Sequence, residues 1–98
     1  MYIEKKLDGD NLVISLEGRL DTMTAPELED VIKGNVDGVK TLTIDMTKLE
    51  YISSAGLRTL LMAKKLLHNK GTVKVTNINE IVREVFEVTG FIDLLDIE

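Results

Sequence analysis

The 98-residue sequence contains no cysteine and only one histidine. Without cysteine there is neither a disulfide framework nor a thiolate metal site, and His68 alone cannot build a histidine metal site. No run approaches the roughly 18 consecutive apolar residues of a membrane-spanning helix, and the first residues lack the charged-then-apolar pattern of a signal segment. These absences predict a cytoplasmic domain with no metal and no cofactor.

Basic side chains are outnumbered: 12 Lys and Arg stand against 17 Asp and Glu, for a net charge of −5. A nucleic-acid-binding domain needs a basic face that displaces counterions from phosphates, and anionic membranes also attract basic surfaces. We therefore expect the protein to bind neither nucleic acid nor membrane. The length and the 44% hydrophobic content suit one domain over residues 1–98, with one core.

Sequence motifs for nucleotide binding and for catalysis are also missing. There is no G-x-x-x-x-G-K-[ST], no G-x-G-x-x-G and no G-x-S-x-G. His68 follows Ser54 by 14 residues on one expected helix, which places it about 20 Å away, beyond hydrogen-bond reach of a serine nucleophile. We therefore expect that the protein is not an enzyme; a nucleotide-hydrolysing domain is the alternative that the missing phosphate loop disfavours.

The order of strands and helices predicts an α/β fold. Alternating runs at 2–7 and 12–17 flank an Asp-Gly turn, which is typical of a β-hairpin that ends at Gly18. Later helices that connect strands imply parallel pairing, so we expect a mixed four- to five-stranded sheet with three to four helices packed on it. The later expected elements are a helix capped by Thr24 and Glu27, a strand at 41–46, a helix at 56–69, a strand at 72–76, a helix capped by Asn79 and ended by Gly90, and a turn or edge strand in 91–98.

Helical spacing predicts which faces are buried. The expected buried positions on the middle helix are Gly56, Leu57, Leu60, Ala63 and Leu67. On the last helix they are Ile81, Val82, Val85, Phe86 and Val88 or Thr89. Gly71 follows the middle helix and is expected to be its left-handed cap.

Two serines, Ser53 and Ser54, stand where a loop becomes the middle helix. A serine there is either an N-cap, which stabilises a helix by about 1 kcal/mol, or an exposed hydroxyl open to modification. The local residues alone favour the cap. The small residues Ala55 and Gly56 would allow a partner to approach closely, and functional loops gather at the carboxyl ends of strands, where Asp21 and Asp45 are expected.

Four segments carry a resemblance that spans essentially the whole chain: Leu-Thr-Ile-Asp-Met at 42–46, Ile-Ser-Ser-Ala-Gly-Leu-Arg-Thr-Leu-Leu at 52–61, Gly-Arg-Leu-Asp at 18–21 before a proline-containing helix start, and Val-Thr-Gly-Phe-Ile at 88–92. They resemble the STAS-domain family, specifically its free-standing anti-sigma-factor antagonists. The resemblance implies the STAS fold and a phosphoacceptor at Ser54, with Ser53 as the alternative. Many family members carry aspartate where this chain has Ser53. The implied partner-binding residues are Asp21, Ser53, Ser54, Ala55, Gly56, Arg58 and Met62, with Asp45 neighbouring the site.

The resemblance also implies a mechanism, partner switching. The unphosphorylated protein, expected to be a monomer, binds an anti-sigma factor that is itself a serine protein kinase, and so frees a sigma factor. Phosphorylation of Ser54 releases the protein from the anti-sigma factor, and a serine phosphatase resets the cycle. The alternative is a STAS interaction module in another signalling, secretion or transport assembly without a sigma factor.

Overall fold

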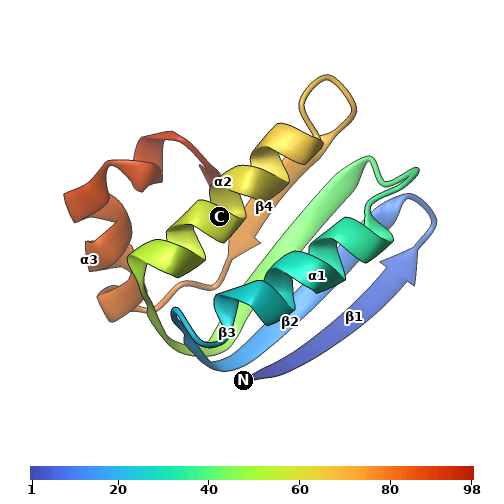
Figure 1. Ribbon diagram of the computed structural model, residues 1–98. Helices are drawn as coiled ribbons and strands as arrows, with labels where there is room; N and C mark the ends of the chain where they lie inside the picture. Colours follow the sequence, from blue (N-terminus) through green and yellow to red (C-terminus); the bar gives the residue numbers. More distant parts are fainter.

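Strands and helices alternate along the chain after an N-terminal hairpin, as the computed structural model of residues 1–98 shows (Figure 1). The elements are β1 (Tyr2–Asp8), β2 (Asn11–Leu20), α1 (Ala25–Asn35), β3 (Thr41–Ile52), α2 (Ser54–Leu66), β4 (Thr72–Thr76), α3 (Glu80–Thr89), the 3₁₀ turn η1 (Phe91–Asp93) and β5 (Asp96–Ile97). The strands form one sheet in the order β1-β2-β3-β4-β5. Only β1 and β2 pair antiparallel, so the predicted α/β fold with a hairpin and central parallel strands is confirmed.

β2 is longer than the sequence pattern predicts. We expected the strand to end at Gly18, but it continues to Leu20. Gly18 adopts φ +105° where the register against β3 shifts, so the glycine forms an irregularity inside the strand instead of its end. The extension brings Leu20 opposite Ile52, the last residue of β3. The two parallel strands therefore end together.

One face of the sheet and the helices above it enclose the core. Alternate residues of β2 and β3 are buried, namely Leu12, Ile14, Leu16, Leu42, Ile44 and Met46. α1 and α2 lie side by side over this face (Figure 1). Every residue predicted for the buried side of α2 is buried, and Thr59 joins them. None of the α-helices has both the length and the apolar character that a membrane span requires.

The predicted buried stripe of α3 is partly wrong. Val82 and Phe86 are fully buried, but the side chains of Ile81 and Val88 are 58% and 81% exposed. Val85 is half-buried and packs against the edge of the core, and Thr89 is exposed. α3 packs against β3 and η1, so only the side of the helix that carries Val82, Val85 and Phe86 is covered. The ends of the helix agree with the sequence: Asn79 accepts a hydrogen bond from the Val82 amide at 2.8 Å, and Gly90 has the left-handed φ of +81°.

Gly71 is not the left-handed residue after α2. That conformation is taken by Asn69, with φ +64°. Gly71 instead lies where a Cβ would be 2.3 Å from the carbonyl oxygen of Lys40. Its missing side chain therefore permits close contact between two backbone segments.

Candidate functional site

The loops that follow β2 and β3 meet at one edge of the sheet. Leu20 lies opposite Ile52 in the parallel register, and the Ser53 amide donates a hydrogen bond to the Leu20 carbonyl at 2.9 Å. The loop that begins at Asp21 therefore starts beside Ser53, although more than 30 positions separate the two in the sequence. The prediction that Asp21 lies near the serines agrees with this register.

The two serines occupy different environments at the start of α2. Ser53 is the N-cap residue by position, but its side chain makes no capping hydrogen bond. The Ser53 hydroxyl oxygen is buried and has no hydrogen-bond partner. Ser54 is the first residue of the helix and is exposed. The exposed serine is thus not the capping residue, and its hydroxyl is open to a partner.

Asp21 folds its own loop. Its Oδ1 accepts hydrogen bonds from the amides of Met23 (3.0 Å) and Thr24 (3.2 Å). The Thr24 hydroxyl donates to the Arg19 carbonyl at 2.8 Å and accepts from the Asp21 amide at 2.9 Å, and it accepts from no amide of α1, so the predicted capping box with Glu27 is not formed. Desolvation acts to raise the pKa of Asp21, but the hydrogen bonds from Met23 and Thr24 outweigh it and hold the pKa below its usual range. Asp21 is therefore a fixed anion at this edge.

Gly56 is turned toward the core. A Cβ on this residue would lie 2.7 Å from both Leu20 Cγ and Ile52 Cγ1. The glycine therefore lets the start of α2 approach the ends of β2 and β3, and it offers no surface to a partner. We leave Gly56 out of the contact surface for this reason, which corrects the expectation drawn from the sequence.

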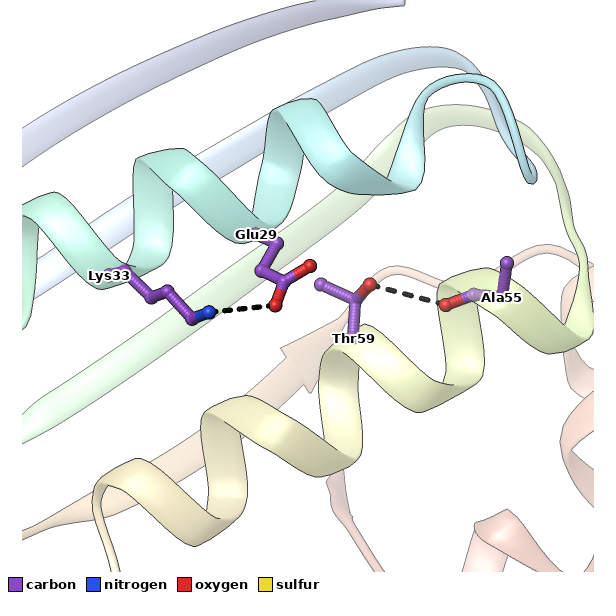
Figure 2. Close-up of polar contacts among 4 residues, drawn as sticks. All are labelled: Glu29, Lys33, Ala55 and Thr59. Carbon is purple, nitrogen blue, oxygen red and sulfur yellow. Dashed lines mark hydrogen bonds and ion pairs between the residues drawn. The ribbon is translucent and has the colours of Figure 1, made fainter.

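A groove of about 280 Å³ runs between α1 and α2, next to the serine junction. Ala55, Arg58 and Met62, predicted as contact residues, all line it. Figure 2 shows Glu29 of α1 facing α2, close to Thr59, whose hydroxyl donates to the Ala55 carbonyl at 3.2 Å. The other lining residues are Thr22, Ala25, Pro26, Glu29 and Thr59.

The α1 side of this groove was missed by the sequence reasoning. Pro26 and Glu29 are three residues apart on α1, so they share one face of that helix. The spacing was readable in the sequence. That this face lies opposite Arg58 depends on how α1 packs against α2, and the spacing of residues within α1 does not predict that packing.

The prediction that Asp45 ends its strand, close to the serines, is wrong. β3 continues to Ile52, seven residues further on, which puts Asp45 about 20 Å from the end of the strand. Asp45 Oδ1 accepts hydrogen bonds from the Thr47 hydroxyl (2.6 Å), the Thr47 amide (3.1 Å) and the Asn77 side chain (3.0 Å). Desolvation opposes them, but these bonds lower the pKa of Asp45. The carboxylate fixes the chain where β3 stops pairing with β4.

Sequence comparison places the chain in a family. A sequence model described as STAS domain matches residues 2–98. The chain belongs to the STAS domain family. BtrV of Bordetella bronchiseptica, provisionally named an anti-sigma factor antagonist, is 38% identical over 94 residues, covering 94% of this chain and 80% of BtrV. The anti-sigma-B factor antagonist of Listeria monocytogenes is 30% identical over 98 residues, covering 96% of this chain and 84% of the relative.

The fold agrees with that assignment. The crystal structure of an anti-sigma factor antagonist from Mycobacterium paratuberculosis matches this STAS domain with a TM-score of 0.89 at 26% identity. The match covers 98% of this chain and 83% of the other. The five-stranded mixed sheet with three α-helices is therefore the STAS fold.

Proposed function

We propose that this STAS domain is an anti-sigma-factor antagonist that works by phosphorylation-controlled partner switching in the cytoplasm. The observation that carries the proposal is the exposed Ser54 at the start of α2, beside the α1–α2 groove. The names of the two relatives supply the class of partner, an anti-sigma factor. In this cycle the unphosphorylated monomer binds an anti-sigma factor with serine kinase activity and so frees a sigma factor.

The switch is a change of one side chain. The kinase transfers the terminal phosphoryl group of ATP to the Ser54 oxygen, which loses its proton, and ADP is released. A serine phosphatase later hydrolyses the phosphoester and restores the hydroxyl. The STAS domain is then the substrate and ligand of its partners, not an enzyme.

Exposure favours Ser54 over Ser53 as the modified residue. A kinase must bring its nucleotide within bonding distance of the serine oxygen, and the Ser53 oxygen is buried. Modification of Ser53 would require local opening of the junction between β3 and α2. Ser54 needs no such opening, because it is already exposed on the first turn.

The physical magnitudes allow a switch that does not unfold the domain. A phosphate adds about −1.5 to −2 charges, and a hundredfold loss of affinity requires about 2.7 kcal/mol. One unpaired charge buried in an interface costs several kcal/mol, which is enough. The same phosphate on the first turn of α2 favours the helix by about 0.3–1 kcal/mol through the helix dipole. We expect the phosphorylated protein to keep its helical circular dichroism.

A capture experiment tests the proposal. Wild type, Ser54→Ala, Ser54→Asp and the control Ser53→Ala are used as baits in extract of the source organism with ATP, and the mass of each recovered bait is measured. We expect a kinase-like anti-sigma factor on every bait except Ser54→Asp, with added phosphate only on wild type and Ser53→Ala. The same partner bound equally by all four, with no phosphate, would contradict the switch and leave a constitutive STAS interaction module of another assembly.

A further inference from the structure

Arg58 lies on the same side of α2 as Ser54. The two residues are four positions apart and both are exposed. Side chains at this spacing are neighbours on a helix, with Cβ atoms about 5–6 Å apart. The flexible arginine side chain easily spans that distance, so its guanidinium can reach a group attached to the Ser54 oxygen.

The Arg58 guanidinium has no ion-pair partner in the fold. The structure contains two ion pairs, Lys33 with Glu29 and Lys74 with Glu98. Glu29 is the acidic side chain that lines the groove with Arg58, and it is 2.9 Å from Lys33 (Figure 2). Arg58 is therefore a free cation beside the proposed modification site.

Two other charged side chains at this edge, Asp21 and Arg19, are already engaged. The Asp21 carboxylate accepts hydrogen bonds from its own loop. The guanidinium of Arg19 lies over the Tyr51 ring, 4.6 Å from its centre. Lys65, on the same helix as Ser54, is 11 residues further along, which is about 16 Å at the rise of an α-helix. Among the cations of α2, only Arg58 combines a short spacing from Ser54 with an unpaired charge.

We infer that Arg58 is the phosphate-holding residue of this domain: once Ser54 is phosphorylated, its guanidinium pairs with the phosphate oxygens. The inference rests on the proposed function in taking Ser54 as the phosphorylated residue. A guanidinium presents parallel N–H donors that match two phosphate oxygens, and such charge-assisted bonds are about twice as strong as neutral ones. Phosphorylation then changes the partner surface twice, because it adds negative charge and withdraws Arg58 from the groove.

The test uses the whole 98-residue chain with phosphoserine incorporated at position 54 during synthesis, so no kinase is required. The second pKa of the phosphate is read by ³¹P NMR titration in wild type, Arg58→Gln, Arg58→Lys and Lys65→Gln. Lys65→Gln is the matched control, because it removes the same charge from the same helix. Circular dichroism of each protein checks that α2 is intact.

We expect the Arg58→Gln phosphate to titrate at a pH higher by about 0.5 than wild type, since the dianion loses its partner. The second pKa of the phosphate in Arg58→Lys is expected between those of wild type and Arg58→Gln. In Lys65→Gln it is expected within about 0.1 of the wild-type value, because the charge of Lys65 is distant and screened. Equal titration of Arg58→Gln and Lys65→Gln overturns the inference. This readout is independent of the capture experiment, so absence of phosphorylation in cells and absence of the Arg58 pair are separate results.

Discussion

Replacement of Gly56 by alanine tests how α2 is seated on the sheet. The new Cβ would lie 2.7 Å from Leu20 Cγ and from Ile52 Cγ1, and 3.0 Å from Leu20 Cδ2. Real Cβ contacts essentially never fall below 3.0 Å. The two nearest atoms lie in the middle of their side chains, so neither can simply swing away. Either both side chains change conformation or the start of α2 moves outward.

Two opposing effects determine the size of the change. Forcing an extra methyl group into a packed core costs typically about 1–3 kcal/mol. Alanine is better than glycine in a helix interior by about 1 kcal/mol, and that gain is smaller in the first turn, where Gly56 lies. We therefore expect Gly56→Ala to lower the free energy of unfolding by about 1–2 kcal/mol. Outward movement of α2 would also displace Ser54 and weaken partner binding.

Gly34→Ala is the matched control. Gly34 lies in α1, has no left-handed φ, and a Cβ there meets nothing within 4 Å. Because Gly34 is the next-to-last residue of α1, where the gain is also smaller than in a helix interior, that substitution is expected to raise the free energy of unfolding by up to about 0.5 kcal/mol. Urea unfolding at pH 7 measures both, with opposite shifts of the midpoint and an unchanged slope. A Gly56→Ala midpoint at or above that of wild type would refute the packing argument.

Two further substitutions test the site and its surroundings. Ser53→Ala removes a buried hydroxyl that has no hydrogen-bond partner, so we expect the free energy of unfolding to stay within about 0.5 kcal/mol of wild type or to rise; a loss of about 1 kcal/mol in urea unfolding would instead show a working N-cap. Asp45→Asn weakens the bonds to Thr47 and Asn77. Folding lowers the pKa of Asp45, so the stabilisation of the fold by its carboxylate is fully present above the unfolded pKa of about 3.9 and is lost as the pH falls through the lower folded pKa. Urea midpoints at pH 7, 5 and 3 should therefore show a gap between wild type and Asp45→Asn that narrows only below about pH 4, and a constant gap would contradict the argument.

Most features set by neighbouring residues were predictable from the sequence; the exception is the capping box of Thr24 and Glu27, because the Thr24 hydroxyl bonds to Arg19 and Asp21 instead. The hairpin turn, the Asn79 cap and the Gly90 terminus depend on groups within a few residues of each other, and all three are present. The parallel pairing of the central strands also follows, because helices alternate with strands. These local and topological rules were sufficient for a mixed α/β sheet with helices packed on it, and the resemblance of the sequence motifs identified that sheet as the STAS fold.

Features set by distant contacts were not predictable in the same way. β2 passes Gly18 and β3 passes Asp45 because each finds pairing partners on the other strand, and the alternation within one strand does not report them. Ile81 and Val88 have helical spacing but face solvent, because the position of α3 on the sheet decides which side is covered. The role of Gly71 is also set by a distant contact, since its backbone lies against that of Lys40, 31 positions earlier in the sequence.

The period of the α-helix explains why one short segment serves both the fold and the proposed switch. Ser54 and Arg58 are one turn apart and face outward, whereas Gly56 lies between them and faces Leu20 and Ile52. A partner that binds this side of α2 contacts the exposed pair without touching the residue that seats the helix. Phosphorylation can therefore alter the surface while the packing beneath it stays the same, and this separation allows a reversible switch in a domain of 98 residues.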